Sequence, residues 1–221
     1  MAPPIVHVQV EAPAQVAPDA AFDVVLRLRA PRGWHLYWAE NPGQTGLPTR
    51  ATLTGAPHAA PRWTAPTHHV GAGDIHSFVY APNGTAVWSV TAPPAGTLDL
   101  AVETSWLACK DVCVPGSAMV RRSVRVGRAR ASPVRPVPLP VVAPAAFSAE
   151  GALRVCLPPT LSVYPDTAYE ALGVPLLHDG AAWSATLPPD AAAALVFTEP
   201  GDPSVSWRVD LAAARAHPTC P

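Results

Sequence analysis

Residues 98–113 read LDLAVETSWLACKDVC, an alternating run that ends in two closely spaced cysteines. A period of two is typical of a β-strand with one buried face. One face of this run would carry Leu98, Leu100, Val102, Thr104 and Trp106, and the opposite face Asp99, Glu103 and Ser105. We therefore predict a strand that leads directly into the cysteine pair.

The same alternation recurs along the chain, between turn-forming Pro, Gly and Asn clusters. It is found in residues 22–28 and 34–38, and again in residues 153–157, 181–187, 195–198 and 205–209. Short strands at roughly 8–12-residue spacing are typical of β-sandwiches rather than of βαβ units. The 29 prolines also oppose long helices. The sequence thus predicts an all-β protein.

The chain length and one proline-rich stretch predict two domains. A chain of 221 residues exceeds the usual size of one domain. From Gly127 to Pro144 five prolines interrupt every strand-length run, which is typical of a semi-rigid linker. We expect two consecutive immunoglobulin-like β-sandwiches, the first in residues 1–128 and a smaller one in 145–221, with residues 129–144 as the linker.

Composition and charge exclude several classes of protein. With 49% hydrophobic and 14% charged residues, the chain can bury cores and is not disordered. Its net charge of −1, without a basic face, excludes nucleic acid as an expected partner. No signal peptide or membrane span is visible in the sequence, yet four cysteines suggest an oxidising compartment. We reconcile these by expecting a mature or excised fragment, in which Met1 replaces a removed targeting segment.

The four cysteines form two expected pairs. Three residues separate Cys109 from Cys113, a spacing that a tight chain reversal can bring within disulfide distance. Cys156 and Cys220 bracket nearly all of the second unit, so we predict a structural disulfide between them. Loop-closure entropy makes the long bridge worth roughly 4 kcal/mol and the short one roughly 2 kcal/mol. The short ring is therefore expected to be the more reducible.

Spacing alone leaves other functions open. Both pairs could be inert structural disulfides in immunoglobulin-like interaction modules. A zinc site would need a second ligand pair beside the cysteines, for which His68, His69 and His76 are the candidates. A copper-binding domain would use the same side chains. We expect neither a metal site nor a small-molecule cofactor.

Two longer motifs favour a redox role. Residues 33–49 read GWHLYWAENPGQTGLPT, and residues 106–115 read WLACKDVCVP. Both resemble the N-terminal domain of the DsbD/ScsB family of membrane thiol–disulfide reductases. The resemblance spans roughly residues 20–128, and the close spacing of the two cysteines is nearer to the ScsB (suppressor of copper sensitivity protein B) branch.

The resemblance implies a periplasmic protein-disulfide reductase, the soluble domain of an inner-membrane protein. Such a domain accepts two electrons from the thioredoxin-like domain of the same membrane-anchored reductase. It passes them to a soluble periplasmic thioredoxin-fold protein, a disulfide isomerase or reductase, through mixed disulfides. By analogy, Cys113 would be the interchain partner and Cys109 the resolving thiol.

One segment departs from the family pattern. In DsbD a loop with carboxylates and a phenylalanine shields the cysteines, whereas the corresponding residues 67–75 here read THHVGAGDI. His68 or His69 could shuttle a proton or form a different shield, and solvated loop histidines are the alternative. Tyr37, Trp38 and Trp106 are expected to be core or sheet-face residues rather than contacts of the thiol pair.

Overall fold

The structure is a computed structural model of the whole chain. It describes residues 5–43, 45–128, 134–142, 145–147, 152–155, 157, 161–165, 177–178, 183–186, 194–199 and 202–210. Every regular element in these ranges is a β-strand, as the sequence predicted. In the described ranges there is accordingly no helix with the length and hydropathy that a membrane span requires.

The chain divides into two compact units. The first contains residues 1–39, 46–64 and 79–137, and the second contains residues 40–45, 65–78 and 138–221. Segments of the 33–49 motif therefore belong to different units. The predicted boundaries at residues 128 and 145 stay a prediction.

Residues 7–126 form two sheets. The first sheet has the strand order β1-β3-β9-β6, and the second has the order β2-β11-β10-β4-β8-β7, with β5 also paired to β10. The strands of the first sheet are β1 (His7–Glu11), β3 (Ala21–Arg29), β6 (Arg62–Trp63) and β9 (Asn83–Thr91). Those of the second are β2 (Gln15–Val16), β4 (His35–Tyr37), β5 (Arg50–Thr54), β7 (Thr67–Gly71), β8 (Ile75–Tyr80), β10 (Gly96–Cys109) and β11 (Cys113–Val126).

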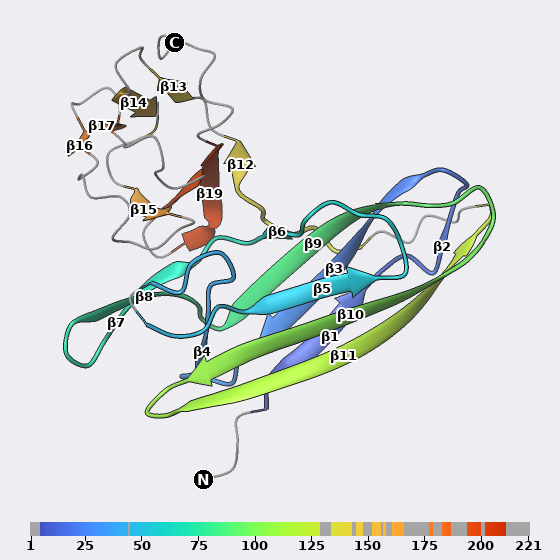
Figure 1. The fold of residues 1–221 in the computed structure, drawn as a ribbon, viewed down its shortest axis with the longest axis horizontal. Helices are drawn as coiled ribbons and strands as arrows, with labels where there is room; N and C mark the ends of the chain where they lie inside the picture. Colours follow the sequence, from blue (N-terminus) through green and yellow to red (C-terminus); the bar gives the residue numbers. More distant parts are fainter. Residues whose placement is uncertain are drawn as a thin grey trace. The chain divides into compact units, whose positions relative to one another are not determined.

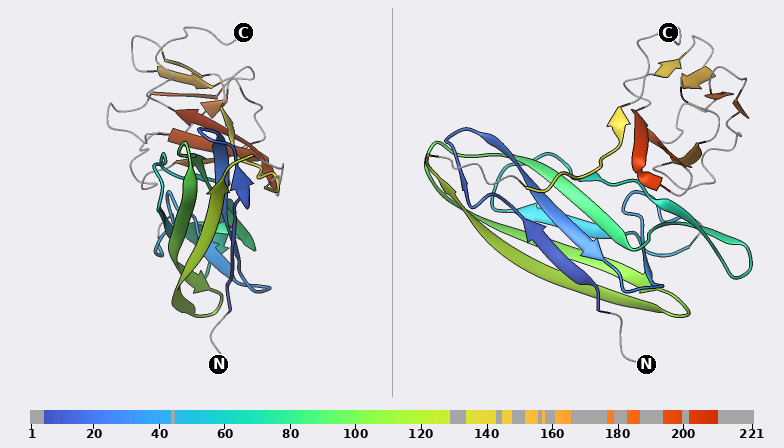
Figure 2. Two further views of the ribbon diagram at one scale, coloured as in Figure 1. Left: turned by 90° about the vertical axis from the view of Figure 1, so that its right-hand side faces the viewer. Right: turned by 180° about the vertical axis from the view of Figure 1, so that it is seen from behind.

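Alternation along the strands builds the core of the first unit. In β3 the side chains of Val24, Leu26 and Leu28 are at most 1% exposed, whereas Asp23 on the opposite face is exposed. In β10 the same pattern buries Leu98, Leu100, Val102 and Thr104. The two opposite views in Figures 1 and 2 place β10 and β11 in one layer and β1 and β3 in the other. These largely antiparallel layers around one core form an immunoglobulin-like β-sandwich.

The described C-terminal strands form two four-stranded sheets in the second unit. Their orders are β12-β19-β18-β15 and β13-β14-β17-β16. The strands are β12 (Val141–Val142), β13 (Ala145–Phe147), β14 (Ala152–Val155), β15 (Ser162–Pro165), β16 (Leu177–His178), β17 (Trp183–Thr186), β18 (Ala194–Glu199) and β19 (Asp202–Asp210). Leu195, Phe197 and Val209 are at most 1% exposed. β12 lies in the proline-rich stretch and pairs in parallel with β19.

Candidate functional site

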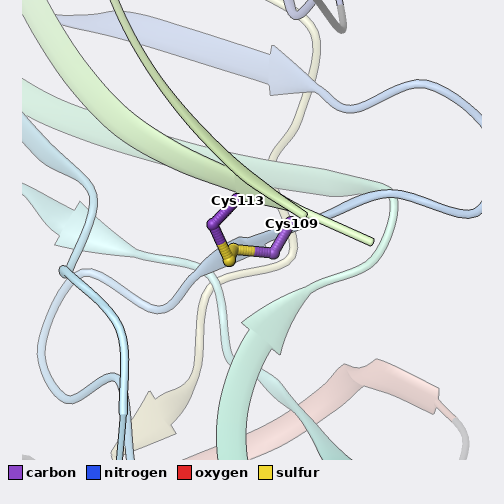
Figure 3. The surroundings of a disulfide bond; sticks show 2 residues. All are labelled: Cys109 and Cys113. Atoms are coloured by element: carbon purple, nitrogen blue, oxygen red, sulfur yellow. A yellow bond between two sulfur atoms is a disulfide. The ribbon is translucent and has the colours of Figure 1, made fainter. Parts of the chain in front are cut away.

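The β10–β11 hairpin brings Cys109 and Cys113 face to face at its end. The two residues are partners in the antiparallel register, and a disulfide joins them with a Cα–Cα distance of 4.1 Å (Figure 3). Three residues connect the strands, and the Lys110 amide donates a hydrogen bond to the Val112 carbonyl at 3.1 Å. The tight reversal predicted from the cysteine spacing is therefore present.

The two cysteines differ in exposure. Cys109 is 2% exposed, whereas Cys113 is an exposed residue. The connecting residues Lys110, Asp111 and Val112 are exposed as well. An incoming sulfur atom can therefore approach Cys113 from solvent, while protein side chains cover Cys109.

Side chains from two further strands bury Cys109. Tyr37 of β4 and Val79 of β8 form one cluster with it, and Leu107 packs against that cluster. β4 pairs with both β10 and β8, so its side chains lie between those of the two neighbouring strands. The expectation that Tyr37 is not a contact of the thiol pair is therefore wrong. For Trp38, which is 1% exposed, the core assignment is confirmed.

Residues of the 33–49 motif fix the position of Tyr37. The Thr49 hydroxyl donates a hydrogen bond to the Tyr37 carbonyl at 2.7 Å, and the Thr49 amide donates to the same oxygen at 3.3 Å. Gly46 has a φ of +98°, and a Cβ atom at this position would overlap the Tyr37 ring. The motif therefore folds back on Tyr37, which in turn packs on the disulfide.

The sequence reasoning missed His35, which lies beside the buried cysteine. His35 of β4 is the register partner of Cys109 on β10. It is 8% exposed, and its ring meets the Tyr37 ring edge-on at a centroid distance of 5.5 Å. A signal was available, because a histidine between Trp34 and Leu36 is a polar residue within an apolar strand. That signal could not tell which strand would lie next to it.

Trp106 is a half-buried residue of β10, on the same face as the buried Thr104 and Ala108. We expected a core or sheet-face residue, and the position of Trp106 on the sheet face agrees with that expectation. It pairs across the hairpin with Gly116 of β11, and a Cβ atom there would lie 2.7 Å from the indole nitrogen. The indole therefore covers the glycine backbone of the neighbouring strand.

The two histidines of the expected shielding segment lie on β7, the first strand of the β7–β8 hairpin. The His68 Nε2 lies 2.9 Å from the His76 Nδ1, and the two rings stack at a centroid distance of 4.9 Å. Asp74 lies 3.5 Å from the other ring nitrogen of His76. Desolvation, followed by charge repulsion from His76 and His69, lowers the pKa of His68. A shuttling or shielding role for His68 and His69 stays a prediction.

The predicted structural disulfide cannot be placed, since Cys156 and Cys220 lie outside the described residues. Within the described part of the chain, no three His, Cys, Asp or Glu side chains are grouped as metal ligands.

Comparison with known proteins gives a family match and a set of similar solved structures, two of which are given below. Residues 3–123 match the family described as "Thiol:disulfide interchange protein DsbD, N-terminal". The N-terminal periplasmic domain of ScsB from Proteus mirabilis has 17% sequence identity and a TM-score of 0.55, with 92% of each chain covered. The N-terminal domain of DsbD from Neisseria meningitidis, in the reduced form, has 16% identity and a TM-score of 0.35, over 53% of this chain and 86% of that chain. None of the curated proteins matches the chain.

Proposed function

The chain belongs to the DsbD N-terminal domain family of thiol:disulfide interchange proteins, and from this membership we propose that it is a periplasmic electron relay. It acts as a protein-disulfide reductase domain of a membrane-anchored protein. Two electrons arrive from the thioredoxin-like domain of that protein. They leave to a soluble periplasmic thioredoxin-fold partner, a disulfide isomerase or reductase. The Cys109–Cys113 disulfide is the group that cycles.

The observation that carries the proposal is the unequal exposure of the two paired cysteines. A relay needs one sulfur that another protein can reach and a second that stays in place to resolve the mixed disulfide. Cys113 is exposed at the end of a hairpin, and Cys109 is buried beneath it. This difference supports Cys113 as the interchain partner and Cys109 as the resolving thiol.

Both half-reactions balance with these roles. During loading, a thiolate of the thioredoxin-like domain attacks the Cys113 sulfur, and Cys109 leaves with the electron pair of the broken S–S bond. The second thiolate of the donor then releases Cys113, so the donor is oxidised and the relay becomes a dithiol. During delivery, Cys113 attacks the partner disulfide, and Cys109 then attacks Cys113 to close the original bond.

Redox titration tests whether the pair cycles. We expect equilibration with graded dithiothreitol ratios, followed by alkylation and peptide mass mapping, to reduce Cys109 and Cys113 first. The proposed Cys156–Cys220 bridge should survive at those ratios, because the protein loses more chain-entropy stabilisation when a long loop opens. If all four cysteines are reduced at the same dithiothreitol ratio, and only when the protein unfolds, the Cys109–Cys113 pair is a structural disulfide and the relay proposal fails.

A trapping experiment identifies the partner. A Cys109→Ser variant retains the exposed sulfur but cannot resolve, so it should accumulate a mixed disulfide with a thioredoxin-fold protein in periplasmic extract. The matched Cys113→Ser variant should accumulate none. Equal capture by both variants would contradict the assignment of Cys113 as the attacking sulfur.

The domain division is proposed on the proline-rich composition of residues 129–144. Expression of residues 1–128 alone should give a folded domain with an intact Cys109–Cys113 disulfide. An unfolded product would mean that this sandwich depends on later residues.

The predicted role of the β7–β8 hairpin has its own test. A His68→Gln/His69→Gln double variant should exchange more slowly if these side chains shuttle a proton, and faster if they shield the sulfurs. An unchanged rate means that they are solvated side chains.

A further inference from the structure

We propose that His35 is the proton acceptor for the buried Cys109 thiol when that residue resolves a mixed disulfide. The inference rests on the proposed relay function and adds a residue to it. Its basis is the position of one buried histidine directly across from one buried cysteine.

The register places the two side chains on the same face of one sheet. His35 and Cys109 are antiparallel partners, and side chains of such partners point to the same side, with Cβ atoms about 4.5–5.5 Å apart. Tyr37 supplies an independent check, since its ring meets the His35 ring and also clusters with Cys109. Three side chains from two strands thus meet at one point.

The burial of both side chains indicates a role for the His35 imidazole. Cys109 is 2% exposed and His35 is 8% exposed, so water has little access to the thiol. A thiol must lose its proton before it attacks, and apolar surroundings disfavour the free thiolate. An adjacent imidazole can accept that proton directly from the thiol.

The side chains of the Cys109 cluster and of the adjoining hairpin end do not provide the same chemistry. Tyr37 contributes an aromatic ring to the cluster around Cys109. A Cβ atom built on Gly33, two residues before His35, would lie 4.0 Å from the Lys110 ammonium, which is a cation and accepts no proton. On the neighbouring strand β8, Val79 is apolar. Asp111 and Cys113 are exposed at the hairpin end.

The resolving step balances as follows. The Cys109 proton passes to an imidazole nitrogen of His35, and the Cys109 sulfur attacks the Cys113 sulfur. The Cys109–Cys113 bond forms, the bond from Cys113 to the partner sulfur breaks, and the partner leaves as a thiolate with that electron pair. The pair of cysteines has then lost two electrons in total, and the imidazolium returns its proton to solvent. In the loading direction the same imidazolium protonates Cys109 as it leaves.

A two-phase reaction isolates this step in the full chain. The protein, reduced only at Cys109 and Cys113, is mixed with 5,5′-dithiobis(2-nitrobenzoate). Attack by Cys113 releases the first coloured thiolate, and resolution by Cys109 releases the second. In the wild-type protein we expect the second rate to rise with pH through the range in which an imidazole titrates.

The variant His35→Gln should slow the second phase by at least about tenfold at neutral pH, with the first phase within about twofold. The difference in second-phase rate between His35→Gln and the wild type should decrease at alkaline pH, because hydroxide then removes the thiol proton. A purely structural role would not produce that recovery. The matched control is His7→Gln, an exposed histidine on β1, which should leave the two rates unchanged.

Two outcomes separate the inference from the function on which it rests. Wild-type rates for both phases in His35→Gln would contradict the assignment of His35 as the proton acceptor. So would a wild-type second phase whose rate shows no inflection in the imidazole range. Neither result would contradict the relay function. The wild-type pH profile tests the proton acceptor even if the variant fails to fold. If the cysteine pair cannot be reduced in the folded protein, the relay itself fails.

Discussion

The β10–β11 and β7–β8 hairpins both turn through three residues, yet the cysteines of the first and the histidines of the second have opposite surroundings. β10 and β11 have 14 residues each, and β10 also pairs with β4 and β5. β7 has five residues and stands at the end of its sheet order, and none of its residues is buried. One hairpin therefore ends in a packed site and the other in a solvated one.

This difference shows what a buried reactive sulfur requires. Cys109 lies on a strand with neighbours on both sides, so side chains of β4 and β8 can cover it. His68 lies on a strand at the end of the order, and its contacts with His76 and Phe78 stay within its own hairpin. A local turn can bring two side chains together, but burial depends on the next strand in the sheet.

The strongest way to break the comparison is to remove one sulfur. Cys113→Ser should reduce exchange with oxidised glutathione to the background rate, because the exposed nucleophile is lost while Cys109 stays covered. Cys109→Ser should still form one stable glutathione adduct, seen by intact-protein mass spectrometry. An adduct on Cys113→Ser, formed as fast as on Cys109→Ser, would mean that both sulfurs are equally accessible.

Substitutions at Gly46 and Gly73 compare the packing around Tyr37 with the packing of the β7–β8 turn. Gly46→Ala should destabilise the protein by about 2–4 kcal/mol, since it combines a positive φ with overlap of the Tyr37 ring. Gly73→Ala in the β7–β8 turn also has a positive φ, but its Cβ atom would have no atom within 4 Å, so it should cost about 1 kcal/mol. Urea unfolding of the oxidised proteins measures both. Equal losses would show that the turn conformation, not the Tyr37 contact, matters.

The Trp106–Gly116 pair should have a smaller effect. Gly116→Ala forces the indole to move, but this side chain is half-buried and can shift outward, so we expect a loss of about 1 kcal/mol or less. Ser117→Ala on the same strand is the control. A loss as large as that of Gly46→Ala would mean that the indole is fixed by its surroundings.

The smallest effect concerns pH and the solvated hairpin. Because the pKa of His68 is lowered in the folded protein, the unfolded chain binds the proton more readily. Neutral His68 therefore contributes its full share of folding stability above pH 6.5, the ordinary histidine pKa. That contribution declines as the pH falls from 6.5 toward the lower pKa of His68 in the folded protein. His68→Gln should flatten this part of the stability curve. The measurement is the urea midpoint of each protein from pH 7 to pH 5. If the midpoints of wild type and His68→Gln change with pH by the same amount, the prediction is wrong.

Local sequence patterns were sufficient for the strands and for the cysteine hairpin. Alternation in residues 98–106 and 22–28 predicted β10 and β3, because the period of two is a property of one strand. The C-x3-C spacing predicted the reversal, because three residues limit how far apart the chain ends can be. The same alternation placed Trp106 on a sheet face, but its contact with Gly116 across the hairpin depends on the register of the two strands.

What surrounds the disulfide followed only from the tertiary structure. Cys109 and Cys113 look equivalent in the sequence, and their unequal burial arises because β4 pairs with β10 at one of them. The same pairing places His35 and Tyr37, more than 70 residues earlier in the chain, beside Cys109. Strand order and register are set by the total burial of many side chains, not by the residues nearest the site. The sequence therefore determined which two cysteines pair, and the sheet determined which of them is exposed and which has a histidine beside it.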